Sequence, residues 1–233
     1  MAEAPMQDTD FDETLREVRR CLEDLLAFEG RYFVVPEAAL ETSPPLVAGG
    51  DLEAFRQQIC ECVRCRLGHT RTNFVFGSGN PDADIFFVGE APGQQEDRQG
   101  LPFVGAAGDL LTKIIGAIQL SREDVYICNV LKCRPPNNRD PQLDEVASCE
   151  PYLQRQIEIV KPRVICCMGR HAAHALLKTD TSLSRLRGKL HQYQGIPLIV
   201  TYHPAALLRN PDYKRAVWED VKWVRRLYDG TQL

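Results

Sequence analysis

The sequence predicts an α/β protein whose mainly parallel sheet of four strands is covered by helices on both faces. Apolar segments alternate with stretches of helical periodicity, which is the pattern that successive βαβ units produce. The predicted strands are Asp84–Val88, Val125–Val130, Arg163–Met168 and Leu198–Tyr202. Helices are expected at 51–60, 109–119, 141–160, 170–178 and 212–228.

The chain of 233 residues has two regions of different composition. Residues 1–50 contain eleven acidic and four basic residues, a net charge of −7, which leaves +3 for residues 51–233 out of the total of −4. Apolar spacing predicts an amphipathic helix at 13–29, and the Pro, Ala and Gly content of 36–50 is typical of a linker. We therefore expect an acidic N-terminal extension at 1–50 and one domain at 51–233. A mildly basic domain permits DNA binding without requiring it.

The composition also predicts a cytoplasmic protein that does not bind membranes. The N-terminus lacks the basic and then apolar pattern of a signal peptide, and no apolar run approaches the roughly 18 residues of a membrane span. In a reducing compartment, the nine cysteines are expected to be metal ligands or buried thiols and not disulfides.

Glycine-rich or polar residues close or follow each predicted strand. The first strand leads into Gly89-Glu90-Ala91-Pro92-Gly93, the second delivers Asn129, and the third and fourth are followed by Gly169-Arg170 and His203-Pro204. Gly89–Gly93 alone could be only a tight turn. However, the carboxyl ends of parallel strands meet at one edge of a sheet, where open α/β sheets bind ligands. The four strand ends together therefore predict one cleft.

Four cysteines have spacing that suits a metal centre. Cys62 and Cys65 form a chelating C-x2-C pair, and Cys133 and Cys149 are the expected second pair, although Cys60 could compete with Cys62. Four thiolates suit a cubane cluster or Zn²⁺, and spacing does not choose between them. The remaining cysteines of the predicted strands, expected to be core thiols, are Cys128, Cys166 and Cys167.

Six motifs occur in the order typical of one family. They are Cys-Val-Arg-Cys-Arg-Leu (62–67), Arg-Thr-Asn-Phe-Val-Phe-Gly (71–77), Gly-Glu-Ala-Pro-Gly-x-x-Glu-Asp (89–97), Gly-Leu-Pro-Phe-Val-Gly (100–105), Asn-Val-Leu-Lys-Cys-Arg-Pro-Pro-Asn-Asn-Arg (129–139) and His-Pro-Ala-Ala-Leu-Leu-Arg (203–209). Over roughly residues 55–228, this set resembles the family 4 uracil-DNA glycosylases, the iron–sulfur type. The resemblance implies a three-layer α/β/α fold and a hydrolase that excises uracil from DNA for base excision repair.

The resemblance also implies a cofactor and partners. It places a [4Fe–4S] cluster on Cys62, Cys65, Cys133 and Cys149, as a structural staple near the DNA surface, and it implies no dissociable cofactor. The expected partner is uracil-containing DNA, single- or double-stranded, bound by a monomer. The N-terminal extension could dock on a replication or repair protein.

Three side chains suit the recognition and release of uracil. Glycosylases flip the target nucleotide out of the duplex, and Phe103 can stack on the extruded base. The amide of Asn129 can accept from uracil N3–H and donate to O4, a pattern that cytosine reverses. His203 is expected to donate to O2 as uracil leaves as an anion, and a neutral imidazole suffices for this.

Glu90 is the second candidate catalytic residue beside His203. The resemblance places Glu90 in the uracil pocket between the backbones of Gly89 and Ala91. Three roles stay open for its carboxylate: orienting the attacking water, stabilising the positive charge on the sugar, or excluding the methyl group of thymine.

A second group of residues is expected to contact DNA outside the pocket. Leu207 and Leu208 have the character of a wedge that enters the base stack, and Arg209 that of a phosphate clamp. The other candidate backbone contacts are Ser78, Lys132, Arg134 and Arg139.

Other interpretations remain open. The chain could be a relative that traps uracil-DNA covalently through a histidine in an inserted basic loop, although 133–139 shows no such insertion. It could be a non-enzymatic iron–sulfur module associated with replication, or a zinc protein. His171 and His174, three residues apart, could bind metal, but without a facing third ligand they are expected to be partly exposed helix residues.

Overall fold

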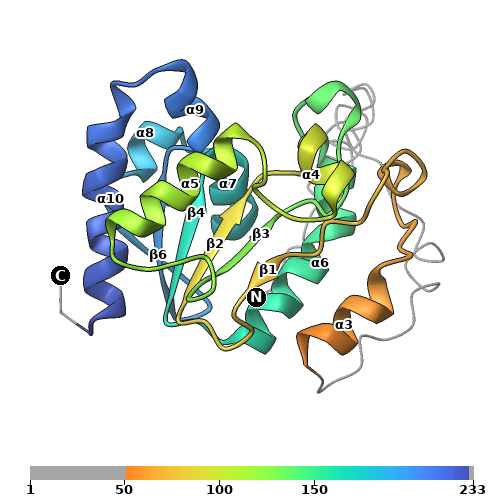
Figure 1. Cartoon of the computed structure of the whole chain (residues 1–233), viewed down its shortest axis with the longest axis horizontal. Helices are drawn as coiled ribbons and strands as arrows, with labels where there is room; N and C mark the ends of the chain where they lie inside the picture. Colours follow the sequence, from red (N-terminus) through yellow and green to blue (C-terminus); the bar gives the residue numbers. More distant parts are fainter. Residues whose placement is uncertain (1–50, 231–233) are drawn as a thin grey trace, which may run out of the picture. The chain divides into compact units, whose positions relative to one another are not determined.

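The computed structural model describes residues 51–230, so the expected N-terminal helix and linker lie outside the described residues (Figure 1). Six strands form one sheet in the order β1-β3-β2-β4-β6-β5. Their bounds are Ser78–Gly79 for β1, Ile85–Gly89 for β2, Tyr126–Asn129 for β3, Val164–Met168 for β4, Leu190–Tyr193 for β5 and Ile196–Thr201 for β6. The four central strands are parallel, as predicted, and β1 and β5 pair antiparallel at the two edges.

The two edge strands extend the predicted four-stranded sheet to six strands. Strand β1 has only two residues, and three of the four residues of β5 are exposed or half-buried. Neither strand has the continuous apolar run that identifies a strand buried on both faces, which is why the sequence pattern did not reveal them.

Five helices match the expected positions. They are α3 (Leu52–Ile59), α5 (Ala106–Ala117), α6 (Leu143–Val160), α7 (Arg170–Leu177) and α10 (Tyr213–Tyr228). Three further helices of six residues or fewer are too short to show a periodicity: α4 (Gln94–Gln99), α8 (Leu183–Leu186) and α9 (Pro204–Arg209). Single 3₁₀ turns occupy Arg66–His69 and Pro136–Asn138.

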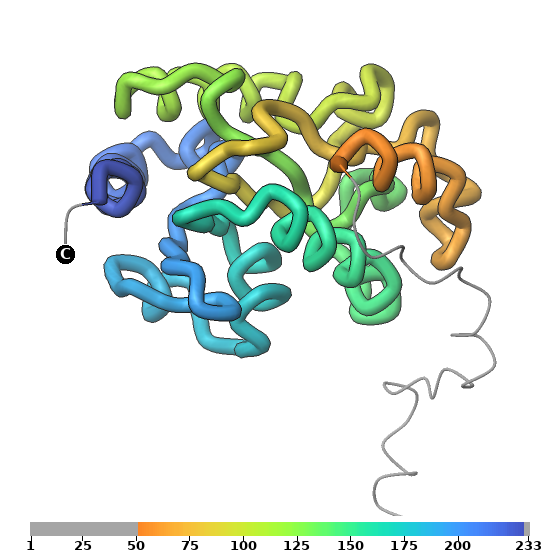
Figure 2. Tube along the Cα trace, turned by 90° about the horizontal axis from the view of Figure 1, so that it is seen from below, coloured from red at the N-terminus to blue at the C-terminus, as the bar shows by residue number. Residues whose placement is uncertain are grey.

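Helices cover both faces of the sheet, which confirms the three-layer α/β/α class. Successive side chains of β2 point to opposite faces, so Phe86 and Val88 pack in one core with α3, α6 and α7. Ile85 and Phe87 pack in a second core with α5 and α10. In Figure 2, the segments that contain α5 and α6 lie on opposite sides of β2.

The strand order creates a crevice at one edge of the sheet. After β2 the chain continues to β3, on one side of the sheet, and after β4 it continues to β6, on the other side. The two connections therefore diverge between the carboxyl ends of the neighbouring strands β2 and β4. Such a switch point is where open α/β sheets bind their ligands. Among residues 51–230, no helix combines the length and the apolar character needed to cross a bilayer.

Candidate active site

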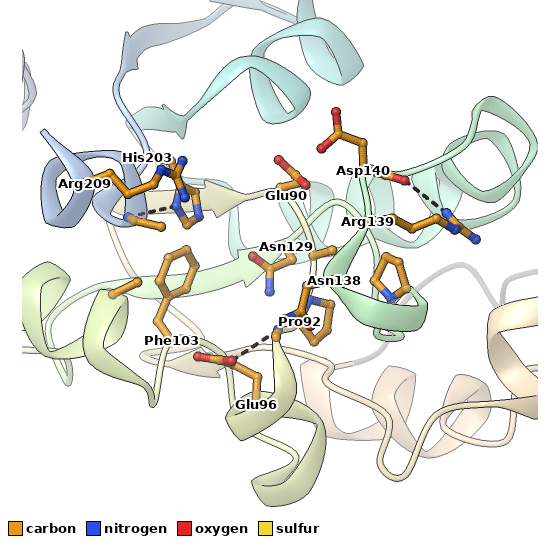
Figure 3. Close-up of a pocket in the computed structure, with 15 residues that line it drawn as sticks. Glu90, Pro92, Glu96, Phe103, Asn129, Asn138, Arg139, Asp140, His203 and Arg209 are labelled. Atoms are coloured by element: carbon orange, nitrogen blue, oxygen red, sulfur yellow. Dashed lines mark hydrogen bonds between the residues drawn. The ribbon is translucent and has the colours of Figure 1, made fainter.

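A cavity of about 400 Å³ lies at the carboxyl ends of β2, β3 and β6, and this volume is in the range of small-ligand sites (Figure 3). It brings together seven of the residues predicted from sequence: Glu90, Ala91, Phe103, Asn129, Arg139, His203 and Arg209. Its walls also include residues that the sequence analysis did not select, among them Glu96, Asn138 and Asp140. Three stretches of the chain, within 90–107, 129–140 and 203–209, therefore line one cavity.

Gly89 supports the floor of this cavity through its lack of a side chain. A Cβ atom on Gly89 would lie 2.3 Å from Asn129 Oδ1 and 2.5 Å from Phe103 Cζ. Strand β2 pairs Gly89 with Asn129, which fixes the neighbouring positions of the two residues. Glycine therefore leaves the room that the amide and the phenyl ring occupy.

Phe103 has a strained backbone that the surrounding structure holds in place. Its φ of 54° is uncommon for a bulky residue, and its ring is buried. The guanidinium of Arg122 donates to the carbonyl oxygens of Phe103 and Pro102, at 3.1 and 2.8 Å. A Cβ atom on Gly108 would come within 1.9 Å of the Phe103 carbonyl oxygen, so only glycine fits there. Strain of this kind is often stored at binding sites.

Glu96 ties two walls of the cavity together, although the sequence analysis gave it no role. Its Oε1 accepts from the amides of Val104 and Gly105 at 3.0 and 3.1 Å, and its Oε2 accepts from the amide of Gly93 at 3.1 Å. The signal that could have found it is its place in the motif at 89–97, three residues after the Gly93 that caps α4.

Asn129 lines the cavity and carries a buried, unpaired acceptor. The residue is 2% exposed, and Oδ1 is one of two buried side-chain N or O atoms in residues 51–230 for which the protein offers no hydrogen-bond partner. Such an atom costs folding free energy, and a ligand that donates to it would remove this cost.

His203 is held as a neutral donor. Its Nδ1 accepts from the amide of Ala205 at 3.1 Å, capping α9, so the imidazole proton is on Nε2. Burial, with a smaller effect from the charge of Arg209, lowers the pKa of His203 to about 4. The ring lies 5.4 Å from that of Phe103, centroid to centroid. An Nε2–H in this position can donate to a pyrimidine oxygen without carrying a charge.

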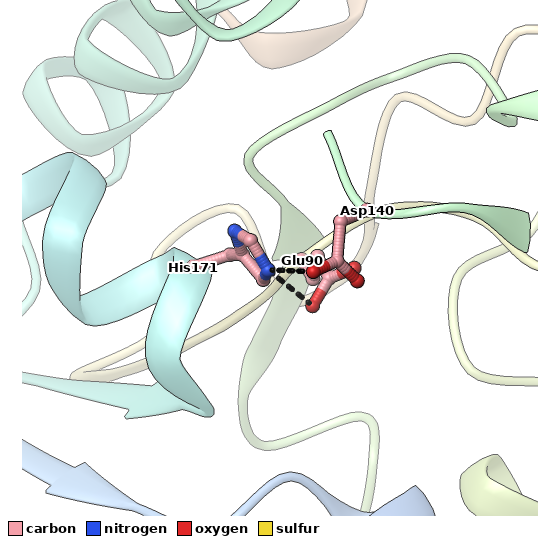
Figure 4. A group of neighbouring side chains, drawn as sticks. All are labelled: Glu90, Asp140 and His171. Carbon is pink, nitrogen blue, oxygen red and sulfur yellow. Dashed lines mark ion pairs between the residues drawn. The ribbon is translucent and has the colours of Figure 1, made fainter. Parts of the chain in front are cut away.

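Glu90 belongs to a group of charged residues that includes Asp140 and His171 (Figure 4). Nε2 of His171 lies 3.8 Å from Glu90 Oε2 and 3.3 Å from Asp140 Oδ2, and Arg170 pairs with Asp140 at 2.9 Å. Burial raises the pKa of Glu90, and Asp140 adds to this rise, whereas His171, Arg170 and Arg209 oppose it. His171 is half-buried, and residues on two other segments face it.

The three residues of the predicted wedge and clamp have different surroundings. Leu208 is 51% exposed, and Arg209 lines the cavity. Leu207 is 2% exposed and packs with Ile118, Val217 and Val221. The prediction that Leu207 enters DNA is therefore corrected, because its side chain is part of a core.

The other candidate backbone contacts lie in three different places. Ser78 lies with Gly79 and Arg122 in a separate hollow beside the amino end of β3. Arg134 is half-buried and donates to Asn138 Oδ1 at 2.7 Å, near the cavity. Arg139 lines the cavity and pairs with the buried Glu145.

Lys132 corrects a second prediction. Its side chain is 0% exposed, and its Nζ donates to the backbone carbonyl oxygen of Asn129 at 2.6 Å. It therefore has no access to a DNA phosphate in this structure.

The four predicted cysteine ligands share one side of the first core. Burial raises the pKa of Cys133 to about 11 and that of Cys149 to about 12, and the neighbouring thiols add to both shifts. Among those neighbours, Cys62 acts on Cys133, and Cys65 acts on both. Cys60 instead donates to the carbonyl oxygen of Gln57 in its own helix.

Hydrogen-bond donors surround these sulfurs. Tyr152 Oη lies 3.2 Å from Cys62 Sγ, an Arg71 nitrogen lies 3.4 Å from Cys133 Sγ, and the Lys132 amide lies 3.3 Å from Cys149 Sγ. Donors of this kind favour thiolates and tune iron–sulfur sites.

Fold and site together define an α/β protein with a cavity of small-ligand size at the carboxyl ends of its parallel strands. The family model of the uracil DNA glycosylase superfamily matches residues 76–222. A type-4 uracil-DNA glycosylase of Sulfurisphaera tokodaii is 48% identical over 76% of this chain and 84% of its own length. The type-4 enzymes of Archaeoglobus fulgidus (47% identical, 76% and 92% covered) and Thermotoga maritima (45% identical, 73% and 91% covered) are similar in the same way. The chain belongs to the type-4 uracil-DNA glycosylases of this superfamily.

Proposed function

We propose that this protein is a DNA glycosylase that hydrolyses the N-glycosidic bond of a flipped deoxyuridine and releases uracil for base excision repair. The observation that carries the proposal is the buried, unpaired Oδ1 of Asn129 in a cavity of about 400 Å³. Family membership gives the reaction, and the geometry supports a role for each residue.

Asn129 reads the base in this proposal. Its free Oδ1 accepts the N3–H of uracil, while its amide nitrogen donates to O4. Cytosine has an acceptor at N3 and a donor at C4, so it would leave the buried amide mismatched. Phe103, held next to Gly89, provides the stacking surface for the extruded base.

His203 stabilises the departing uracil anion in this proposal. As the glycosidic bond lengthens, negative charge develops on O2 and positive charge on the sugar. The Nε2–H of a neutral His203 donates to O2, and a preorganised donor of this type contributes on the order of 3 kcal/mol to the rate. Glu90, partly buried at the other side of the cavity, orients water or stabilises the sugar cation in its carboxylate form.

DNA binding is assigned to residues around the cavity mouth. Leu208 is the exposed apolar side chain that would replace the flipped nucleotide in the stack, and Arg209 and Arg134 are the phosphate contacts. The domain boundary near residue 50 and a docking role for the N-terminal extension are part of the same proposal.

The donor set of four cysteines fits an iron–sulfur cluster. Four thiolates, with hydrogen-bond donors beside three of the sulfurs, suit a polynuclear iron–sulfur core held by Cys62, Cys65, Cys133 and Cys149. When bound, this group supplies cross-links between three segments of the chain.

Uracil release from a dU-containing oligonucleotide tests the function. The purified native protein is expected to free uracil and leave an abasic site, and His203→Ala is expected to slow this about a hundredfold with little change in DNA affinity. A denaturation-resistant protein–DNA adduct in place of free uracil would instead identify a covalent trap. No release by iron-loaded protein would refute the enzymatic function, and zinc in place of iron would refute the cluster.

A further inference from the structure

Lys132 is a buried cation between the cysteine site and the candidate uracil site. Its side chain is 0% exposed, and lysine is almost never buried to this degree without a partner. Its Nζ donates to the carbonyl oxygen of Asn129 at 2.6 Å, and the side chain also hydrogen-bonds the buried Cys128 thiol. The burial of a charge is costly unless it is hydrogen-bonded, so these contacts hold the side chain in one place.

The backbone of Lys132 lies directly against the cysteine site. Its amide donates to Cys149 Sγ at 3.3 Å, and Cys133 is the next residue in the chain. Lys132 therefore contacts a predicted metal ligand through its backbone and Asn129 through its side chain.

The segment from Asn129 to Lys132 also runs beside the other wall of the cavity. The amides of Val130 and Leu131 donate to the carbonyl oxygens of Gly89 and Glu90, each at 3.0 Å. The amide of Val75 donates to the Lys132 carbonyl oxygen at 2.8 Å. Asn129 and Lys132 are thus the first and last residues of one four-residue turn. Asn129 is the candidate residue for base recognition, and the amide of Lys132 is hydrogen-bonded to the predicted ligand Cys149.

We propose that Lys132 is a positioning residue for uracil recognition, which couples the metal-ligating loop to Asn129. Its buried Nζ holds the Asn129 carbonyl, while its backbone is held by Cys149, and this fixes the direction in which the Asn129 side-chain amide faces the base. This inference rests on the proposed function.

The test compares two substitutions of Lys132 with a surface control in otherwise native protein. Lys132→Met keeps the length of the side chain but removes the donor and the charge, and Lys132→Gln keeps a donor. Lys222→Met is the control, because Lys222 pairs with Glu219 on the outer surface of α10. Iron content, single-turnover uracil release, inhibition by free uracil and DNA affinity are measured for each.

We expect iron-loaded Lys132→Met to lose about tenfold in both uracil release and free-uracil affinity, with unchanged DNA affinity. Lys132→Gln should recover part of this loss, and Lys222→Met should behave as the native protein. The midpoint potential of the bound cluster should fall in Lys132→Met, because reduction adds negative charge and a nearby positive charge has been removed. If the lysine had only a structural role, its loss would not lower the affinity for free uracil while the affinity for DNA stays unchanged.

Two results would overturn the inference alone while the native protein remains active. One is an iron-loaded Lys132→Met whose release rate and uracil affinity stay within about twofold of native, a change too small for a lost hydrogen bond to a charged group. The other is loss of iron or of folding in both Lys132 variants, which would assign the lysine to building the cysteine site. An inactive, iron-loaded native protein would refute the proposed function, and this inference with it.

Discussion

At the scale of single residues, Asn129 and Gln156 present the same chemical problem with different consequences. Each has a buried side-chain oxygen without a hydrogen-bond partner in the protein. The amide nitrogen of Gln156 donates to the Phe76 carbonyl oxygen and to the Tyr126 hydroxyl, at 2.9 and 3.1 Å, so Gln156 fastens the first core. Asn129 instead lines the cavity. The unpaired acceptor lowers the free energy of unfolding, and a ligand that donates to it would gain binding free energy from this.

Substitution by leucine should separate these two roles. Asn129→Leu is expected to reduce uracil release by about a hundredfold or more while the free energy of unfolding stays equal or rises, because an unpaired acceptor is removed. Gln156→Leu should instead lower the free energy of unfolding by about 2 kcal/mol, since two buried acceptors lose their donor. Urea unfolding and uracil release, measured on both variants, check the prediction. Equal destabilisation of both would contradict it.

The acid limb of the pH profile should belong to Glu90 and not to His203. Burial raises the pKa of Glu90 above its ordinary 4.5 and lowers that of His203 to about 4. As the pH falls, Glu90 is therefore protonated first, and kcat/KM should decline while His203 is still neutral. Glu90→Gln should abolish this limb and lower the rate about a hundredfold at neutral pH.

Stability should change in the opposite direction at Glu90. A carboxyl group whose pKa is raised in the folded protein favours folding when protonated, and this contribution is lost as the pH rises through the raised pKa. Glu90→Gln should therefore raise the melting temperature at neutral pH, and the gain should vanish below the ordinary pKa of 4.5. A gain that persists at low pH would point to packing instead of ionisation.

At the scale of elements, α9 shows how one short helix serves two functions. It begins at Pro204, just after His203, and its neighbouring leucines point in different directions: Leu207 into a core and Leu208 into solvent. The sequence motif predicted a DNA-binding role for these residues but no helix, and it could not separate the two leucines. Six residues are too few for a helical period, and the packing partners of Leu207 come from α5 and α10.

Alanine substitutions in α9 should separate effects on stability from effects on uracil release from duplex DNA. Leu207→Ala should lower the free energy of unfolding by about 3 kcal/mol, because it leaves a cavity in a packed core. Leu208→Ala should leave stability within about 0.5 kcal/mol of native but slow uracil release from duplex DNA. Release from single-stranded DNA, where no base pair must be broken, should change less. A Leu208→Ala variant with native rates on duplex DNA would remove its assigned role.

At the scale of the whole described domain, parallel strand order is what made the site predictable. Glu90 follows β2, Asn129 is the last residue of β3, and His203 follows β6, and strand ends that share one edge of a sheet must converge. Side chains whose position depends on loop conformation were not predictable in this way. Lys132 has the charge of a phosphate contact, and only the turn after β3 directs it inwards to the Asn129 carbonyl. Asp140 and His171 meet through a loop and α7 that no sequence pattern relates.

The cysteine site should control the shape of the cavity from a distance. The proposed ligands, when they hold the cluster, would cross-link the segment after α3, the turn after β3 and the buried face of α6. The loop between Cys133 and Cys149 carries Asn138, Arg139 and Asp140 into the cavity wall. Cys149→Ala should therefore remove iron, lower the melting temperature and reduce uracil release together. Cys167→Ala is the matched control, because that thiol is also buried in the first core but belongs to β4. It should keep iron and cost only about 1 kcal/mol of stability. Iron content, visible absorbance and melting curves of both variants test this prediction.

If Cys149→Ala retained full iron and activity, a ligand set without Cys149 would replace the one proposed. The loop that forms the cavity wall would then have to be anchored by other contacts, such as the Arg139–Glu145 pair.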